Sequence, residues 1–369
     1  MKIVADDRIP FLRGVFEPFA EVVYLPGKKV TPADVADADA LIVRTRTRCD
    51  KALLGNSKVR CVATATIGFD HIAGDELDDC GILWSNAPGC NADSVKNYIA
   101  SALAAMDIPL RGKVMGIIGV GQVGSRVAAV AESFGMKVLL NDPPRADLEG
   151  SEKFVSLDEV LAQSDIVTLH VPLEKAGKYP TVSMANGEFF RKMRKGAWFF
   201  NSCRGEVMEE KEFLQAVSSG KLGGSLIDVW PGEPEISREM LTAVDFGTPH
   251  IAGYSADGKA NGTSASVRFV ARTLGIKELI DFQAAELPEP VYPAMIDLAG
   301  VSDADEAVKK AILHAYDIRR DTVSLQENPG DFEALRGKYW SRREFKAYKV
   351  CNAPDSAAAA LKKLGFEVI

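Results

Sequence analysis

The stretch VMGIIGVGQVGSR, Val114–Arg126, decides how this 369-residue chain folds. An apolar run of strand length leads into the glycine loop Gly119–Gly124, a helical pattern follows, and a second apolar run ends at Asp142. A strand, a G-x-G-x-x-G loop, a helix, a second strand and an acidic residue about 20 positions on are the pattern of a dinucleotide-binding βαβ unit. A glycine-rich turn without a ligand is the alternative interpretation, and this full context disfavours it.

Each glycine of the loop has a separate task. Gly119 permits a tight turn, Gly121 lets the backbone approach a pyrophosphate, and Gly124 permits close packing of the helix on the strand. The first turn of the helix offers N–H groups to phosphates. Asp142 is placed to accept hydrogen bonds from ribose hydroxyls and to repel a 2′-phosphate, which favours NAD over NADP. Arg145 nearby is the one feature that points the other way.

Apolar runs alternate with helical patterns on both sides of this unit. Such alternation predicts an α/β fold with two doubly wound, Rossmann-like parallel sheets. Long helices are predicted over Ala92–Met106, Gly124–Phe134 and Gly262–Leu274. The predicted strands are KIVAD from Lys2, ADALIVR ending at Arg44, VRCVATA from Val59, ILWSNA from Ile82, KVMGIIG from Lys113, KVLLND ending at Asp142, DIVTLHVP ending at Pro172, GAWFFNS from Gly196 and GSLIDVW from Gly224.

A proline-rich segment, AAELPEPVYPA at Ala284–Ala294, interrupts this series and is typical of a linker. Beyond it lie a helical pattern over Ala304–Ile318, a strand-like AYKVCN from Ala347, a helix rich in Ala and Lys, and a final FEVI strand. We therefore predict a separate small α+β domain over residues 286–369.

Composition excludes several classes of function. The formal net charge is −7, with 47% hydrophobic and 26% charged residues, so a nucleic-acid partner is not expected. No cationic segment followed by an apolar stretch begins the chain, and no apolar run is long enough to span a bilayer. We expect a cytoplasmic protein without a membrane partner. The six scattered cysteines form no CxxC pair, so reduced thiols are expected rather than a metal site.

Three polar residues follow predicted strands of the second sheet. Arg204 comes after GAWFFNSC, Glu233 lies in DVWPGEP, and His250 lies in FGTPHIAGY. Ligands of doubly wound sheets bind outside the carboxyl ends of the strands, so we expect these side chains to converge there.

Their chemistry suits the oxidation of a 2-hydroxy acid by hydride transfer. A histidine takes the hydroxyl proton as hydride leaves, a carboxylate orients the imidazole, and an arginine binds the substrate carboxylate as a fork. Each residue also has a structural alternative: His250 as a core histidine, Glu233 as a turn residue, Arg204 as a contact at a helix start. The remaining histidines are predicted to be structural or surface residues: His71, His170 and His314.

These motifs resemble the D-isomer-specific 2-hydroxyacid dehydrogenases. The segments that carry the resemblance are ADALIVRTRT, ATATIGFDHI, NAPGCNA, GIIGVGQVGSR, NDPPR, NSCRGEV, DVWPGEPE and HIAGYSADGKANGT. The resemblance implies a catalytic triad of Arg204, Glu233 and His250, with the histidine as acid/base. It also implies a discontinuous substrate-binding domain (1–92 and 253–280) with an NAD-binding domain (93–252) inserted in it.

The tail segments HAYDIRRD, GDFEALRGKYWSRREF and AALKKLGF are similar to a small C-terminal dimerisation domain found in one branch of that family. This likeness implies a homodimer and a phosphorylated sugar acid as substrate. Arg342 and Arg343 in the tail are candidates for reaching a partner's site.

The resemblance also implies individual contacts. Thr45, Thr66 and Tyr254 are expected to contact substrate. The family often has threonine where Val171 stands, so only a backbone contact to NAD is expected at that position. The residues expected to contact NAD are Gly119, Gly121, Gln122, Val123, Gly124, Asp142, Val171, Ser202, Cys203, Arg204, Asp228 and Gly253.

A phosphorylated substrate needs a cationic partner. Arg44, Arg46 and Arg48 alternate with polar residues, so an extended segment places them on one face. Arg44, at the end of a predicted strand, is the preferred phosphate ligand, and a solvated arginine edge is the preferred interpretation of the other two.

Two rival functions stay open at this point. One is another dehydrogenase of the same family, such as phosphoglycerate dehydrogenase. The other is a non-enzymatic NAD sensor, like the corepressors that share the fold and keep similar site residues. The C-terminal tail disfavours both.

Overall fold

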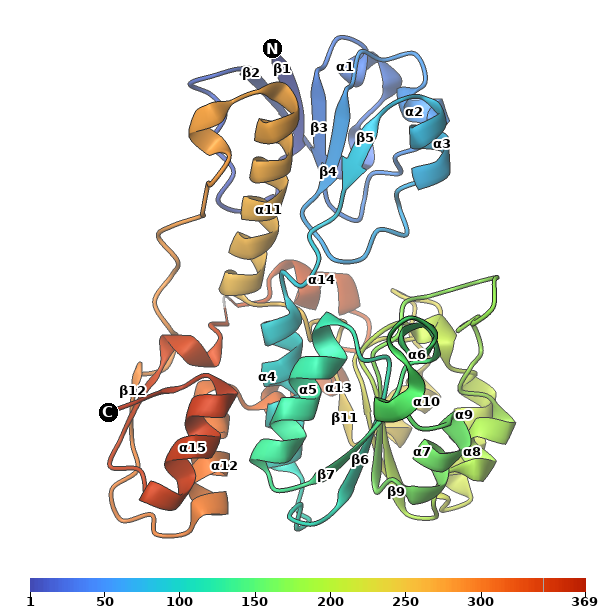
Figure 1. Cartoon of the computed structure of the whole chain (residues 1–369), viewed down its shortest axis with the longest axis vertical. Coiled ribbons are helices and arrows are strands. Elements are labelled where there is room, and N and C mark those ends of the chain that lie inside the picture. The colour runs from blue at the N-terminus through green and yellow to red at the C-terminus, as the bar shows by residue number, and fades with distance from the viewer. Residues whose placement is uncertain (341) are drawn as a thin grey trace. The chain divides into compact units, whose positions relative to one another are not determined.

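The computed structural model describes residues 1–340 and 342–369, and its contacts divide the chain into two compact units. The first unit is discontinuous and consists of Met1–Asn91 and Ser255–Pro288. The second consists of Ala92–Tyr254 and Glu289–Ile369. Each is described separately below, and Figure 1 labels their elements.

A five-stranded parallel sheet forms the centre of the first unit, in the order β2-β1-β3-β4-β5. The chain runs from β1 outward to β2 and then returns to the other side of β1 as β3, so the switch point lies between β1 and β3. The strands are β1 (Lys2–Asp6), β2 (Glu21–Leu25), β3 (Ala40–Val43), β4 (Cys61–Thr64) and β5 (Leu83–Ser85).

Helices cover both faces of this sheet, and β3 and β4 are therefore buried along their whole length. The longest, α11 (Ala256–Leu274), begins at Ser255, whose side chain accepts from the Gly258 N–H, and it buries Val267 and Val270 against Ile3 and Ile42. The others are α1 (Pro32–Val35), α2 (Lys51–Leu54), α3 (Gly74–Asp79) and the 3-10 turns η1 (Gly27–Lys29) and η4 (Lys277–Leu279).

The second unit contains a six-stranded parallel sheet in the order β11-β10-β9-β8-β6-β7. Its switch point lies between β6 and β8, where the glycine loop follows β6. The strands are β6 (Val114–Ile118), β7 (Lys137–Asn141), β8 (Ile166–Leu169), β9 (Ala197–Asn201), β10 (Leu222–Ile227) and β11 (Phe246–Gly247).

Two hydrophobic clusters sandwich this sheet, one formed with α4 and α5 and the other with α7, α8 and α9. The helices are α4 (Ala92–Ala105), α5 (Gln122–Ser133), α6 (Pro143–Glu149), α7 (Leu157–Gln163), α8 (Gly187–Lys192), α9 (Glu210–Ser218) and α10 (Arg238–Ala243), with 3-10 turns η2 (Ser151–Lys153) and η3 (Gly205–Val207).

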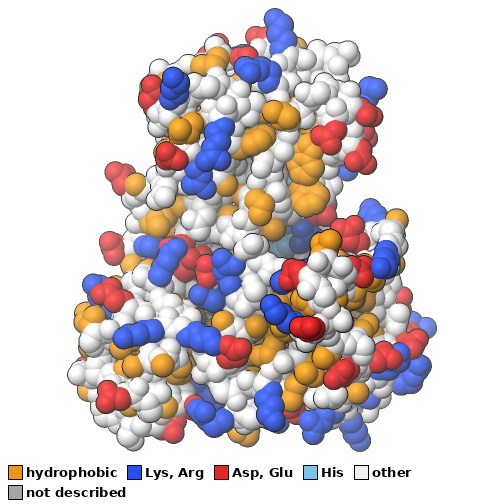
Figure 2. Space-filling model, viewed as in Figure 1, with side chains coloured by type: hydrophobic (Ala, Val, Ile, Leu, Met, Phe, Trp, Pro, Cys, Tyr) orange, Lys and Arg blue, Asp and Glu red, His pale blue; other side chains and the backbone are white. Residues whose placement is uncertain are grey.

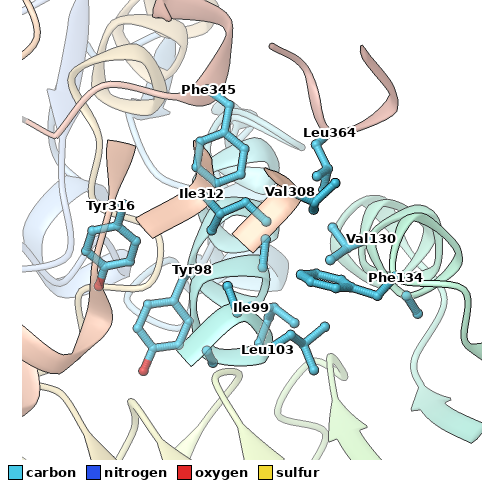
Figure 3. Close-up of a cluster of buried hydrophobic side chains, with 14 of the residues drawn as sticks. Tyr98, Ile99, Leu103, Val130, Phe134, Val308, Ile312, Tyr316, Phe345 and Leu364 are labelled. Carbon is cyan, nitrogen blue, oxygen red and sulfur yellow. The ribbon is translucent and has the colours of Figure 1, made fainter. Parts of the chain in front are cut away.

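The C-terminal segment packs on α4 and α5 of the same unit. Tyr98 and Leu103 of α4 share one buried cluster with Ile312, Phe345 and Leu364 (Figure 3). The segment has its own parallel sheet, in the order β12-β13-β14. Its elements are β12 (Met295–Asp297), α12 (Ala304–Ala315), α13 (Ile318–Glu327), α14 (Phe332–Gly337), η5 (Phe345–Ala347), β13 (Lys349–Cys351), α15 (Asp355–Leu364) and β14 (Glu367–Val368).

The predicted α/β class with two doubly wound sheets and a small C-terminal α+β part is confirmed. The edge strand β2, the two-residue β11 and the helices α13 and α14 were not predicted from the sequence. The helix predicted over Ala304–Ile318 ends at Ala315, because Asp317 caps a new helix through the Arg319 N–H.

Acidic and basic side chains are interspersed on the faces that Figure 2 shows. Among the described residues, no helix is long and apolar enough to cross a membrane.

Candidate active site

The glycine loop of the second unit has the geometry that its sequence predicts. Gly119 has a φ of +86°, and a Cβ there would lie 2.6 Å from the His170 carbonyl oxygen and 2.9 Å from a Val171 methyl group. A Cβ on Gly124 would lie 2.0 Å from the Gly119 carbonyl oxygen. A Cβ on Gly121 would meet nothing within 4 Å. The first and third glycines are therefore required by packing, and the second leaves the backbone open to a ligand.

The N-terminus of α5 lies directly behind this opening. Its N-cap residue is Gly121, so no side chain caps the N–H groups of Gln122 and Val123. These residues fit a pyrophosphate, because uncapped N–H groups at a helix N-terminus bind anions.

Asp142 follows β7 beside the loop and already has two internal partners. Its Oδ2 accepts from the Val120 N–H at 2.8 Å, and its Oδ1 accepts from the Arg145 N–H at 3.1 Å as the N-cap of α6. The Arg145 guanidinium donates two hydrogen bonds to the Glu149 carboxylate, both at 2.7 Å. Glu149 thus occupies the guanidinium of Arg145, which agrees with NAD as the cofactor.

Arg204 follows β9 in a loop shaped by Asn201 and Gly205. The Asn201 side chain, which is fully buried, accepts from the Cys203 N–H and donates to the Arg204 carbonyl. A Cβ on Gly205 would lie 2.2 Å from the Trp230 carbonyl oxygen, so this loop lies directly against the one that follows β10. The loop that carries Arg204 and the loop that carries Glu233 therefore meet at one edge of the sheet.

Glu233 and His250 are hydrogen bonded to each other. His250 Nδ1 lies 2.7 Å from Glu233 Oε2, and Glu233 Oε1 accepts from the Trp230 N–H at 2.9 Å. His250 has a φ of +55°, a left-handed conformation that is uncommon for residues other than glycine and is found at functional sites. With Nδ1 on the carboxylate, Nε2 is the nitrogen left for a substrate proton.

Asp228, predicted to contact NAD, holds the turn after His250. Its Oδ1 accepts from the Ile251 N–H at 2.7 Å and the Thr248 hydroxyl at 2.6 Å, and its Oδ2 accepts from the Ala252 N–H at 2.9 Å. The side chain is 1% exposed, and this burial raises its pKa. A carboxylate has about four acceptor sites. Three are used here, so one is left for a ligand N–H donor.

The neighbouring cofactor candidates lie in the same region of the second unit. The Ser202 hydroxyl is buried without a hydrogen-bond partner among the described residues. Cys203 is also buried, which raises the pKa of its thiol to about 11, so it is protonated at neutral pH. Gly253 follows the two residues that Asp228 binds.

In the first unit, Arg44 lies at the switch point between β1 and β3. Its Nε is 3.7 Å from Asp6 Oδ1, and Asp6 is 2% exposed at the end of β1. The Arg44 Nε is buried and has no hydrogen-bond partner among the described residues. Thr45 beside it is exposed.

The other two predicted arginines do not share a face with Arg44, because the chain turns after β3 instead of remaining extended. Arg46 is exposed on this turn, and Arg48 is 63% exposed and paired with Asp50.

Thr66 follows β4 in a small polar cluster of the same unit. Its hydroxyl lies 2.9 Å from that of Thr64 and donates to the Gly68 carbonyl at 2.8 Å. His71 Nε2 is bonded to Thr64, which supports its predicted structural role.

Tyr254 belongs to the second unit, where its ring meets the edge of Tyr339 at a centroid distance of 6.0 Å. The Arg336 guanidinium lies 5.8 Å from the centre of the same ring.

The suggestion that Arg342 reaches a partner's site is wrong. Arg342 is 1% exposed and donates to the Ala252 carbonyl of its own chain at 2.8 Å. Among the described residues, no group of His, Cys, Asp or Glu side chains is arranged to hold a metal ion.

Sequence reasoning missed Asp6, and it assigned Arg342 to a partner's site instead of to its own chain. Asp6 had a usable signal, since it is a carboxylate directly after a buried strand at a switch point. The contact of Arg342 joins residues 90 positions apart and left no comparable local signal.

Family models match almost the whole chain. The catalytic domain of the D-isomer specific 2-hydroxyacid dehydrogenases matches residues 6–107, and the NAD-binding domain of the same family matches residues 91–252. A third model, described only as a domain of unknown function, matches residues 287–365. This chain belongs to the D-isomer specific 2-hydroxyacid dehydrogenase family, and it is an NAD-dependent oxidoreductase.

Several relatives that match over nearly the full length carry one name. An erythronate-4-phosphate dehydrogenase of Bacteroides fragilis is 48% identical over 95% of this chain and 99% of its own. An enzyme of the same name from Escherichia coli O157:H7 is 40% identical over 100% of this chain and 99% of its own. A solved structure of an NAD⁺-bound 3-phosphoglycerate dehydrogenase from Entamoeba histolytica is 25% identical, with a TM-score of 0.64, over 78% of this chain and 99% of its own.

Proposed function

We propose that this enzyme oxidises 4-phospho-D-erythronate to the corresponding 2-oxo acid with NAD as acceptor, a step of pyridoxal 5′-phosphate biosynthesis. The observation that carries the chemistry is the His250–Glu233 pair, at 2.7 Å, in loops at the carboxyl end of the sheet that also carries the glycine loop. The name shared by the full-length relatives supports the substrate.

His250 is the proposed acid/base. Its Nε2 takes the proton of the substrate hydroxyl as the hydride leaves the hydroxyl-bearing carbon, so the O–H and C–H bonds break and the C–O bond becomes a carbonyl. Glu233 keeps Nδ1 protonated and stabilises the imidazolium that forms. The Trp230 N–H in turn fixes the Glu233 carboxylate.

Arg204 is proposed to bind the substrate carboxylate and to polarise the developing carbonyl, because a guanidinium forms two parallel hydrogen bonds with a carboxylate. Arg44 is proposed to bind the phosphate, with Thr45, Thr66 and Tyr254 as further substrate contacts. The unfilled donor capacity of the Arg44 Nε supports this role.

The proposed cofactor contacts lie at the carboxyl end of the second sheet. The first turn of α5 and the glycine loop hold the pyrophosphate, and Asp142 holds the ribose. Asp228, the backbone of Gly253 and the Ser202–Arg204 loop would supply further contacts to bound NAD. When bound, NAD supplies the hydride acceptor of the reaction.

Two further proposals concern the protein's state in the cell. We propose that the C-terminal segment forms a homodimer and that the enzyme acts in the cytoplasm. The formal net charge of −7 agrees with a small-molecule enzyme that binds no nucleic acid. Light scattering on the purified full chain tests the dimer directly.

The substrate assignment is tested with a panel of hydroxy acids. Purified enzyme is given 4-phospho-D-erythronate, 3-phospho-D-glycerate or D-lactate, with NAD and with or without a 2-oxo acid acceptor that would recycle retained cofactor. We expect the highest kcat/KM with the first compound. Equal or better turnover of phosphoglycerate would overturn the substrate, and NAD binding without turnover of any of the three would favour an NAD sensor.

A further inference from the structure

The C-terminal segment places a buried arginine against the turn that carries His250. Arg342 is 1% exposed, and its Nη2 donates to the Ala252 carbonyl at 2.8 Å. Longer contacts of the same atom reach the Ile251 carbonyl at 3.5 Å and the Ser94 carbonyl at 3.4 Å. The family model that matches this segment assigns it no function.

Asp228 grips the same two residues through their N–H groups. It accepts from Ile251 at 2.7 Å and from Ala252 at 2.9 Å. The N–H groups are thus fixed by a carboxylate directly after β10, and the carbonyls are fixed by a guanidinium from the C-terminal segment. The turn begins at His250, whose left-handed φ of +55° must be imposed by such surroundings.

The guanidinium belongs to a buried polar network. It lies 4.1 Å above the Tyr316 ring and is attracted by the Asp321 and Asp228 carboxylates. Asp321 accepts from the Tyr316 and Tyr339 hydroxyls, both at 2.8 Å. Tyr339 in turn meets the ring of Tyr254, so the network touches the turn at both Ala252 and Tyr254.

We propose that Arg342 is a positioning residue for the His250–Tyr254 turn, so that the C-terminal segment completes the active site of its own chain. The proposal rests on the proposed function, since it assigns His250 the acid/base role. A displacement of about 1 Å at such a group is enough to cost about 100-fold in rate.

Lysine is a poor replacement at this site. Arginine presents a planar fork of donors and stacks on an aromatic ring, and both features are used by Arg342, on the carbonyls and on Tyr316. A lysine would keep the positive charge beside Asp321 but lose the stacking and the fixed direction of the donors. The two substitutions therefore separate charge from geometry.

The experiment compares Arg342→Met and Arg342→Lys with two controls in the same segment. Arg319→Met removes an arginine that is 55% exposed and paired with Asp317, and Val350→Ala removes methyl groups from a fully buried side chain of β13. We expect kcat to fall about 10- to 100-fold in Arg342→Met and less in Arg342→Lys. The pH profile of kcat/KM should also change in Arg342→Met. The carboxylates beside His250 are Glu233 and Asp228, and loss of the Arg342 charge changes the electrostatic environment of Asp228.

The controls identify a merely structural effect. Arg319→Met should stay within about 2-fold of wild-type kcat, and Val350→Ala should lower Tm without lowering kcat at 25 °C. If Val350→Ala loses as much kcat as Arg342→Met for the same loss of Tm, the positioning role is overturned. It is also overturned if Arg342→Met folds and keeps the wild-type kcat and pH profile. Should Arg342→Met fail to fold, the same test is made with Arg342→Lys: wild-type kcat and pH profile in that variant would overturn the positioning role.

A spectroscopic readout separates this proposal from the proposed function. The chain has four histidines, so the ring signals of His250 can be assigned by NMR with a His250→Asn variant. We expect Arg342→Lys to shift the His250 ring signals and to leave those of His71 unchanged. If wild-type enzyme turns over no hydroxy acid, the proposed function fails, and unshifted His250 signals would separately overturn the positioning role.

Discussion

The two larger parallel sheets of this chain use the residues at the carboxyl ends of their strands in different ways. At the edge of the second sheet, His250 is bonded to Glu233 and Asp228 accepts three hydrogen bonds from the residues around it. At the switch point of the first sheet, Arg44 is 3.7 Å from Asp6 and its buried Nε lacks a hydrogen-bond partner among the described residues. The His250–Glu233 pair is held by internal hydrogen bonds, and Arg44 has donor capacity left over.

This difference is what the two tasks require. An acid/base must have its direction and tautomer fixed before the reaction, and internal hydrogen bonds achieve this. A phosphate-binding arginine must keep donors for the ligand, and a buried donor without a partner costs about 1–3 kcal/mol until an acceptor arrives. The comparison therefore predicts loss of turnover from changes in the second sheet and loss of substrate affinity from changes in the first.

The largest effect is expected from His250→Asn. Asparagine tolerates the left-handed conformation that His250 adopts, so the backbone turn should persist. Without the base, kcat should fall about 10²- to 10⁴-fold, while the Kd for NAD stays near wild type. Steady-state kinetics and NAD titration measure both, with His314→Asn in the C-terminal segment as the matched control. Retention of more than about a tenth of wild-type kcat would remove His250 from the acid/base role.

A smaller and different effect is expected from Arg44→Met. Loss of a charge-assisted contact of about 1.5–3 kcal/mol should raise KM for a phosphorylated substrate about 10- to 100-fold. Turnover of unphosphorylated D-erythronate should be unaffected, because that compound has no phosphate to bind. Arg48→Met removes an exposed arginine of the same segment and should change neither value.

Arg44→Met leaves the buried Asp6 carboxylate, which is 2% exposed, without its positive partner. An Arg44→Met, Asp6→Asn double variant tests whether this unpaired carboxylate causes the rise in KM. Recovery of a low KM in the double variant would contradict the phosphate role. Equal loss for both substrates in Arg44→Met would contradict it as well.

How far the sequence predicts this molecule depends on the range of each interaction. The strands β1, β6 and β9 are apolar runs with local boundaries, and all three were predicted. The edge strand β2 is only partly buried and its apolar run is short, so the pattern gives little signal. The start of α11 at Ala256 was placed six residues late, because Ser255 was not identified as its cap.

In the candidate site, too, some contacts could be predicted from the sequence and others could not. The convergence of Glu233 and His250 was predicted from the rule that ligands of doubly wound sheets bind outside the carboxyl ends of the strands, although the short strand β11 before His250 was not predicted. The partners of Asp228 and Arg342 are backbone groups of a turn, and the conformation of that turn is set by packing. A backbone carbonyl carries no residue-specific signal, so sequence cannot identify it as the partner of a distant arginine.

The smallest expected effect is a change in the free energy of unfolding, and it comes from a histidine beside the second sheet. His170 follows β8, where its Nε2 lies 3.0 Å from the Thr168 hydroxyl, and burial lowers the pKa of His170 to about 3. In the unfolded chain a histidine has a pKa of about 6.5. Between these values the unfolded state binds one proton more than the folded state, so the free energy of unfolding falls as pH falls, by at most about 1.4 kcal/mol per pH unit.

His170→Gln isolates this contribution, because glutamine keeps a polar nitrogen near the position of Nε2 and does not titrate. Urea unfolding from pH 7.5 down to pH 4.5 should give nearly parallel curves for wild type and variant above about pH 6.5, and the wild type should lose stability faster below it. His314→Gln, on the C-terminal segment, serves as the control and should follow the wild type. If His170→Gln and wild type remain parallel down to pH 4.5, His170 is protonated in the folded state, and the second sheet is less closed around β8 than its hydrogen bonds indicate.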